Sequence, residues 1–283
     1  MRGNKLLNIA YYIAVITLLL IILFPIYAMI KQSLVYEKET YERTLFPKNI
    51  TLENYLSLAR EVSQAGAVGA VGFFVFVRNS FIISISVTLI TLFVSTFGGY
   101  SLARLNFRGR DLCSLIVIIS YLMPAVVLMV PLYILIANIN LLNTFEGLIL
   151  ALLSRSAPFC TWFMVGYFKA IPKEIEEVAM VDGASRLGAL FKIILPLSLP
   201  SLVVNMIFAF TLAWNDFIYS YMLIDKTQLL PLSVALYRLI HGEFVPWGTL
   251  MAGGIIASLV PVTLFLIIQR YIIAGLTAGA VKG

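Results

Sequence analysis

Residues 79–103 read NSFIISISVTLITLFVSTFGGYSLA, an apolar stretch of 25 residues that contains no Asp, Glu, Lys or Arg. About 20 apolar residues of α-helix, rising 1.5 Å each, cross the hydrocarbon core of a bilayer. The stretch therefore predicts a membrane-spanning helix. Five further stretches are comparable, and we expect spanning helices at 10–30, 112–137, 147–168, 201–223 and 249–270. The sequence thus predicts an all-α integral membrane protein with about six transmembrane helices.

The composition of the whole chain agrees with this interpretation. Of the 283 residues, 61% are apolar and 12% are charged, whereas a soluble domain carries roughly 25% charged residues. The net charge of +6 comes from Lys and Arg residues scattered between apolar runs, so we expect no nucleic-acid partner. Cys113 and Cys160 have no metal-ligand spacing, and we predict no metal site.

The short loops predict the orientation of the helices. Arg104, Arg108 and Arg110 crowd the link after the stretch 79–103, whereas the link at 138–147 has no Lys or Arg. Positive residues collect on the cytoplasmic side, so the Arg-rich link and both chain termini are expected in the cytoplasm. The outer loops are then 31–78, 138–147 and 224–248. We expect one transmembrane domain, 1–283, with a cytoplasmic loop at 169–200 and a cytoplasmic tail at 271–283.

Two features complicate the simple picture. Residues 65–103 are almost continuously apolar, too long for one span and too short for two. We expect Ala65–Val77 to form an outer segment that leads into the second helix at Asn79, with a re-entrant loop as the alternative. Three prolines lie inside two of the predicted spans and should kink them; they are Pro124 and Pro131 in 112–137 and Pro261 in 249–270.

The loop 169–200 is the most charged stretch on that side and predicts two short amphipathic helices. Pro172 suits the first turn of a helix, and the acidic residues at 174, 176 and 177 suit its positive N-terminal end. Asp182-Gly183 is a turn pair, in which Gly adopts a positive φ without steric cost. Ser185 can cap the second helix, which Pro196 and Pro200 end. That helix carries an apolar stripe at Leu187, Leu190, Phe191 and Ile194.

The same loop carries a recognisable motif. Glu177-Val178-Ala179, Gly183, Ile193 and Leu195-Pro196 resemble the EAA loop of binding-protein-dependent ABC importer permeases. That pattern is E-A-A, three residues, G, nine residues and I-x-L-P, and only Val178 departs from it. The strings at 171–177 and 181–185 are similar to the carbohydrate branch of the family. The string at 214–217, WNDF, and the tail 275–283 resemble the maltose (MalG-like) permeases of that branch.

The resemblance implies a type I ABC importer permease fold with a cytoplasmic coupling (EAA) helix, in the cytoplasmic (inner) membrane of a prokaryote. It also implies that this helix docks on a separate ATPase, whose closure moves the membrane helices. The expected complex holds a second, different permease, two ATPase subunits and an external solute-binding protein. The chain itself would be non-catalytic and without cofactor, ATP and Mg²⁺ being bound by the ATPase. The coupling residues would be Glu177, Ala179, Asp182, Gly183, Ala184, Leu187 and Pro196.

Polar residues inside the predicted fifth span suggest a solute path. A charged side chain in a span must face a partner or water, so Asp216 is a functional candidate. We expect Asn215 and Tyr219 to border the path of a hydroxyl-rich solute. The alternative is that Asp216 only holds helices together, through Arg78 or Arg155. In the maltose branch the partner permease supplies the sugar site, so direct contact of this chain with solute stays open.

Other function classes have weaker support. A self-sufficient secondary transporter usually shows an inverted repeat with ion-coupling residues in broken helices, and we find no internal repeat. The sequence contains no HExxH, GxSxG or GxxxxGK[ST] motif, which disfavours a membrane enzyme or a self-contained ATPase. We therefore expect an importer permease for a di- or oligosaccharide, with glycerol phosphate as the alternative solute.

Overall fold

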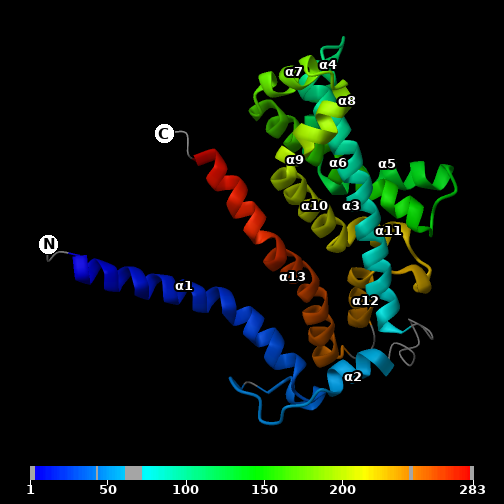
Figure 1. Cartoon of the computed structure of the whole chain (residues 1–283). Helices are drawn as coiled ribbons and strands as arrows, with labels where there is room; N and C mark the ends of the chain where they lie inside the picture. The colour runs from blue at the N-terminus through cyan, green and yellow to red at the C-terminus, as the bar shows by residue number, and fades with distance from the viewer. Residues whose placement is uncertain (1–3, 43, 61–71, 242–244, 281–283) are drawn as a thin grey trace. The chain divides into compact units, whose positions relative to one another are not determined.

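The computed structural model describes residues 4–42, 44–60, 72–241 and 245–280, and the regular elements within these ranges are all helices (Figure 1). Two compact units make up the chain. The first comprises residues 1–74 and 235–259, and the second comprises residues 75–234 and 260–283. The second unit contains the predicted coupling loop and the predicted solute path.

Four long helices confirm four of the predicted spans. Each is long and apolar enough to cross a bilayer within the part of the chain that the structure describes. They are α1 (Asn4–Ser33), α3 (Phe73–Arg104), α6 (Phe145–Ala170) and α13 (Trp247–Ala280). The helix α13 continues through Ala280, so most of the expected tail at 271–283 extends this helix.

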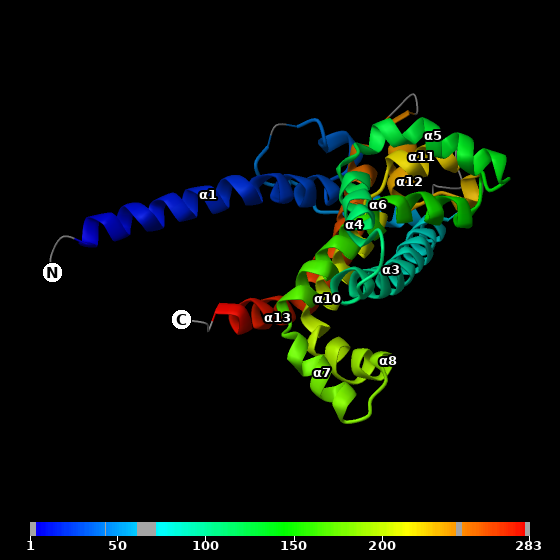
Figure 2. The same ribbon diagram turned by 90° about the horizontal axis from the view of Figure 1, so that it is seen from above.

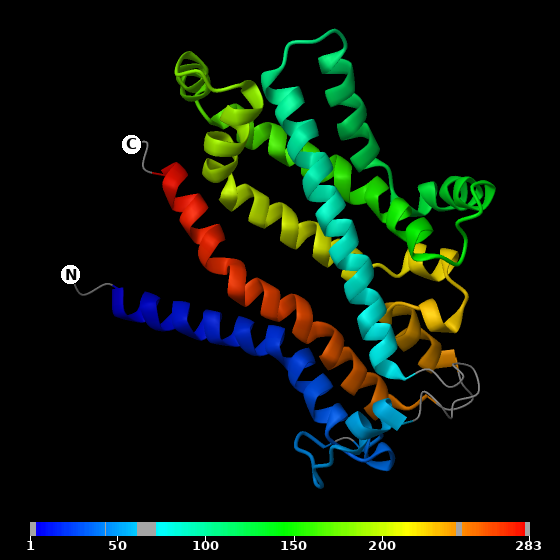
Figure 3. The same ribbon diagram turned by 45° about the vertical axis from the view of Figure 1, so that its right-hand side comes forward.

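The predicted span 112–137 is broken in two. It consists of α4 (Arg110–Leu122) and α5 (Ala125–Asn138), which are bent by 104° (Figure 3). Pro124 stands directly before α5 and lacks the N–H that would continue α4. Proline also forces the preceding residue out of the helical region, and Met123 is extended, with φ −68° and ψ 126°. The kink predicted at Pro124 is confirmed, but a single continuous helix over 112–137 was wrong.

The predicted span 201–223 is also interrupted. The helix α10 (Leu199–Trp214) is capped by Asn215, and the short helix α11 (Ile218–Leu223) follows. Asn215 has φ −90° and ψ 0°, which ends the regular helix. Residues 215–217 therefore lie between two helices. The prediction that they lie within one continuous helix was wrong. The next helix, α12, covers Leu232–Arg238.

The start of α3 differs from the expectation as well. The helix begins at Phe73, six residues before Asn79, because no helix-breaking residue interrupts 73–78. The remainder of the predicted outer segment, residues 65–71, lies outside the described residues. Asn79, predicted to open the helix, instead holds a later segment: its Nδ2 donates to the carbonyls of Gln228 at 2.9 Å and Leu230 at 3.0 Å.

Small and polar residues bring α3 against α6 and α10. A Cβ atom on Gly99 would lie 2.6 Å from the Cβ of Met164, so the two backbones approach as only glycine allows. The hydroxyls of Thr91 and Ser156 are 2.7 Å apart. Asn205 of α10 donates to the carbonyl of Cys160 at 3.2 Å. Close contact and interhelical hydrogen bonds thus replace the hydrophobic effect, which is weak between helices in lipid.

In the first unit, the described part of the predicted outer loop contains η1 (Glu37–Glu39) and α2 (Glu53–Arg60). The carboxylate of Glu37 accepts hydrogen bonds from the backbone N–H groups of Trp247 at 2.7 Å and Gly248 at 3.0 Å. An anion at this position satisfies the free N–H groups at the start of α13. Asn54 donates to the carbonyls of Ser33 and Val35. These contacts tie the loop to α1 and α13.

Candidate functional site

The loop between α6 and α10 folds into a compact element that we call the elbow, residues 171–198. It contains α7 (Lys173–Val181), α8 (Arg186–Ala189), the π-helical turn η3 (Leu190–Ile194) and α9 (Leu195–Leu197). Within the second unit, α7 and α8 lie together at one end, away from α5 and α11 (Figures 1 and 2). The two predicted helices are present, although Pro172 stands directly before α7 and not in its first turn.

A glycine turn separates the two arms of the elbow, the first arm being α7 and the second arm being α8 with η3 and α9. Asp182 caps the end of α7, and Gly183 has φ +90°, the left-handed region that favours glycine. The N–H of Gly183 donates to the carbonyl of Met180 at 3.1 Å, and the N–H of Ala184 donates to that of Ala179 at 3.0 Å. This pair of bonds is a Schellman motif. It satisfies carbonyls at the end of α7 and sets the direction of the following arm.

The second arm divides the predicted apolar stripe. Ser185 caps α8 as expected, accepting from the N–H of Gly188 at 3.1 Å. Leu190 and Ile194 are fully buried and pack in one cluster with residues of α3 and α6, whereas Leu187 and Phe191 remain exposed. The stripe was predicted with α-helical spacing, but the turn widens into a π-helix from Leu190 to Ile194.

The outer face of the elbow is apolar and exposed. Val178 is 60%, Val181 is 87% and Leu187 is 58% exposed, and these three surround the glycine turn. The carboxylates of Glu177 and Asp182 are exposed on the same element. Ala179, by contrast, is buried and faces inward. Of the predicted coupling residues, Glu177, Asp182 and Leu187 are therefore accessible to a partner, while Ala179 supports the turn from inside.

Sequence reasoning missed the buried glutamate of the elbow. Glu176, and not Glu177, faces the bundle; its Oε2 lies 3.3 Å from Nε of Arg104, and its Oε1 accepts a hydrogen bond from Tyr100. A signal was available, because Glu176 lies three residues before Ala179 and thus on the same helical face. Three acidic residues within four positions concealed which one faces inward.

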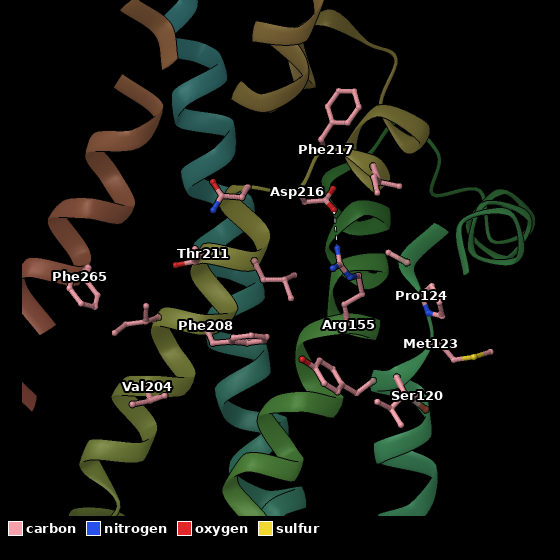
Figure 4. A pocket seen from close by; sticks show the side chains of 17 residues that line it. Ser120, Met123, Pro124, Arg155, Val204, Phe208, Thr211, Asp216, Phe217 and Phe265 are labelled. Carbon is pink, nitrogen blue, oxygen red and sulfur yellow. Dashed lines mark ion pairs between the residues drawn. The ribbon is translucent and has the colours of Figure 1, made fainter. Parts of the chain in front are cut away.

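A cavity of about 1010 Å³ lies at the two helix breaks of the second unit. The junction of α4 and α5, the middle of α6, α10 and residues 215–218 surround it, together with Phe265 of α13 (Figure 4). Four aromatic side chains line it, those of Tyr121, Phe208, Phe217 and Phe265. The ring of Phe159, which is not a lining residue, lies 4.0 Å from that of Phe208 and 4.9 Å from that of Tyr121. The predicted solute-path residues Asn215 and Asp216 both line this cavity.

An ion pair lies in the cavity wall. Nη1 of Arg155 is 3.6 Å from Oδ1 of Asp216, whose side chain is 1% exposed (Figure 4). The other carboxylate oxygen accepts from the N–H of Ser220 at 2.9 Å and from its hydroxyl at 3.0 Å. Asp216 thus joins α6 to the start of α11. Of the two partners proposed for it, Arg155 is within ion-pair distance, whereas Arg78 donates to Asn79.

The third residue predicted for the solute path lies behind the cavity wall. Tyr219 is fully buried, its hydroxyl donates to the carbonyl of Ala125 at 3.3 Å, and it is not among the residues that line the cavity. The guanidinium of Arg155 lies 5.8 Å from the centre of its ring. Of the two residues, Asn215 is exposed to the cavity, whereas Tyr219 is buried and packs against Arg155.

Known proteins resemble this chain along its whole length. The trehalose/maltose transport system permease protein MalG of Thermococcus litoralis is 33% identical over 285 residues, which cover 100% of both chains. The sulfoquinovosyl glycerol transport system permease protein SmoH of Agrobacterium fabrum is 36% identical over 278 residues, covering 96% of this chain and 93% of that one.

A solved structure has the same fold. A chain of a bacterial ABC transporter involved in the import of the acidic polysaccharide alginate superposes with a TM-score of 0.81 at 21% identity, covering 96% of this chain and 98% of that one. Residues 95–277 match the family described as binding-protein-dependent transport system inner membrane component. The chain is therefore a multi-pass membrane subunit that belongs to the family of binding-protein-dependent ABC importer permeases.

Proposed function

We propose that this chain is the permease subunit of an ATP-driven sugar importer and that its elbow docks on a separate ATPase. The sugar class is supported by relatives named for trehalose and maltose, arabinooligosaccharides and diacetylchitobiose. The observation that carries the docking proposal is the exposed apolar face at Val178, Val181 and Leu187. These side chains lie on the elbow, whose helices are short and capped. The exposed carboxylates of Glu177 and Asp182 lie on the same element.

The rest of the assembly is a proposal that the family membership supports. We infer a second, different permease, two ATPase subunits and an external solute-binding protein, and we place both chain termini and the elbow in the cytoplasm. The arginines at 104, 108 and 110, of which Arg104 contacts the elbow, support that orientation. ATP and Mg²⁺ would be bound by the ATPase. A related solved structure is described as an alginate transporter in complex with a pentasaccharide-bound periplasmic protein.

The docking proposal predicts that a charge at Val181, at the tip of the elbow beside the glycine turn, strongly weakens binding of the ATPase. Burying a valine side chain contributes about 1.5–3 kcal/mol, and Val181 is 87% exposed and free to be buried by a partner. Val181→Glu should therefore weaken retention of the ATPase at least about tenfold. The measurement is the amount of ATPase that co-purifies with a tagged chain in detergent.

Phe107→Glu provides the matched control. Phe107 is also apolar and exposed, in the Arg-rich link before α4 and outside the elbow, and this variant should retain the ATPase. Equal retention by both variants would show that the elbow tip is not the docking face. A chain that moves sugar alone under an ion gradient, with no ATPase present, would contradict the importer proposal as a whole.

We further propose that the cavity at Asn215 and Asp216 borders the path of the sugar. The Arg155–Asp216 pair carries no net charge, and Asn215 and Thr211 add neutral hydrogen-bonding groups to an aromatic wall. Flat aromatic faces beside amide and guanidinium donors suit a neutral ring with several hydroxyls. The geometry thus favours an uncharged sugar over glycerol phosphate at this position.

Asn215→Ala tests this assignment. Losing one neutral hydrogen bond costs about 0.5–1.5 kcal/mol, so sugar uptake by the reconstituted complex should fall about two- to tenfold. The complex should still assemble, because the amide of Asn215 is exposed to the cavity. Asn106→Ala, which removes an exposed amide outside the cavity, is the control and should leave uptake unchanged. Unchanged uptake in Asn215→Ala would remove this residue from the path.

A further inference from the structure

Three buried polar side chains join the elbow to the C-terminal end of α3. Tyr100 and Arg104 are four residues apart on α3, which places them on one helical face, and both contact Glu176 of α7. Tyr100 is 4% exposed, Glu176 is 5% exposed, and the side chain of Arg104 is 3% exposed. The carboxylate thus receives an ion pair and a hydrogen bond from a helix 76 positions earlier in the chain.

The same two residues of α3 also contact the end of α6. Nη2 of Arg104 donates to the carbonyl of Ile171 at 2.7 Å, and the ring of Tyr100 meets that of Phe168 edge-on, with centroids 6.0 Å apart. Phe168 and Ile171 precede Pro172, whereas Glu176 follows it. The end of α3 therefore holds the chain on both sides of the joint between α6 and α7.

That joint would otherwise be a natural pivot. Ile171 is extended, with φ −76° and ψ 127°, and Pro172 supplies no N–H to continue the helix. An extended residue before a proline is typical of a boundary at which one helix ends, so no continuous helix backbone joins α6 to α7. Here the pivot is bridged by directional contacts. Leu190 and Ile194 also pack in an apolar cluster with α3 and α6. Apolar contacts are not directional, so they do not fix the orientation of the elbow on these helices as an ion pair does.

Stability alone does not account for a buried ion pair. Replacing such a pair by apolar residues of similar volume is often neutral or stabilising, because taking two charges out of water is costly. A buried ion pair and hydrogen bond are directional, and they therefore define the orientation of one helical element on another. At this position the two elements are the arm that carries the docking face and the longest apolar helix of the second unit.

We propose that Tyr100, Arg104 and Glu176 form a latch that makes α7 and the end of α3 one rigid lever, so that a displacement of the elbow passes directly into α3 and is not absorbed at Pro172. The inference rests on the proposed function, since the displacement is supplied by the docked ATPase. The three residues are positioning residues: their side chains are buried, and none of them lines the cavity. Their role is to set how much movement of the membrane helices each ATP hydrolysis event produces.

The test measures sugar moved per ATP hydrolysed by the complex purified through this chain and reconstituted with its binding protein. The double variant Arg104→Met with Glu176→Met removes both charges and keeps the volume. It should retain the ATPase and its activity, while the transport-to-hydrolysis ratio falls about fivefold or more, within the range by which single links change the coupling between sites. Tyr100→Phe keeps the ring on Phe168 and loses only the hydroxyl, and its ratio should fall about twofold.

The exposed pair Arg110–Asp111 gives the matched control. Its members lie 3.3 Å apart with side chains 34% and 92% exposed, and the double variant Arg110→Met with Asp111→Met should keep the wild-type ratio. If the buried double variant does not assemble, Tyr100→Phe decides. A wild-type ratio in whichever latch variant assembles would overturn the latch while leaving the proposed function intact. A wild-type complex that contains no ATPase would overturn the proposed function instead.

Discussion

Gly99→Leu should strongly destabilise the folded chain. A Cβ atom at this position would lie 2.6 Å from the Cβ of Met164 and 3.3 Å from the backbone nitrogen of Val165. Overpacking costs about 1–3 kcal/mol, and more when the clash is with backbone that cannot rotate away. We expect the upper end of that range, which lowers the ratio of folded to unfolded chain about a hundredfold.

Gly166→Leu is the matched control for this prediction. Gly166 lies on α6, and no neighbouring heavy atom stands within 4 Å of a Cβ built there. This variant should give the wild-type yield of monodisperse chain on size-exclusion chromatography and the wild-type thermal stability in detergent. If Gly99→Leu matched it in both measurements, α3 and α6 would not pack as closely as described.

Asp216→Ala should destabilise the chain by about 3 kcal/mol. The substitution removes the ion pair with Arg155 and both hydrogen bonds from Ser220. Removing one partner of a buried pair typically costs 3–5 kcal/mol. The lower end applies here because the side chain of Arg155 is 35% exposed and can be solvated from the cavity. The measurement is the thermal unfolding of the purified chain, together with sugar uptake by the reconstituted complex.

Asp111→Ala is the control, because Asp111 also pairs with an arginine but is 92% exposed. Exposed pairs contribute about 0–1 kcal/mol, so its melting temperature should stay close to that of the wild type. Asp216→Asn should be intermediate, since the amide oxygen can still accept from Ser220. An Asp216→Ala chain as stable as Asp111→Ala would show that the buried pair does not hold α6 to α11.

A further variant separates a structural role from a role in transport. Arg155→Met with Asp216→Asn removes both charges and should recover most of the stability, because no buried charge is left without a partner. Uptake should remain low if the pair borders the sugar path. Recovery of uptake together with stability would reduce Asp216 to a residue that holds helices together, which the sequence left as an alternative.

Much of the fold could be predicted from the sequence because membrane insertion depends on local composition. Runs of about 20 apolar residues must be helical in lipid, where every backbone hydrogen bond has to be made within the segment. That reasoning located the apolar spans of α1, α3, α6 and α13 to within six residues at each end. The glycine turn of the elbow was equally local, since Asp182-Gly183 marks a position that needs a positive φ.

The helix breaks were harder to predict, because the apolar content of a segment does not indicate where its helix bends or in which direction the next helix runs. Pro124 signalled a kink but not a bend of 104°. At residues 215–217 the sequence has neither Gly nor Pro to mark the end of α10. There the decisive contacts come from elsewhere: Arg155 of α6 and Ser220 of α11 fix Asp216 in place.

The sequence by itself determined where the four long apolar helices lie, where the glycine turn of the elbow lies and which family the motif resembles, because each of these depends on neighbouring residues. Only the tertiary structure decided that Glu176 is the buried glutamate, that Leu187 faces outward while Leu190 faces inward, and that Tyr219 lies behind the cavity. Those outcomes depend on which distant side chain comes within hydrogen-bonding or packing distance. For Glu176 that side chain is Arg104, 72 positions earlier in the chain.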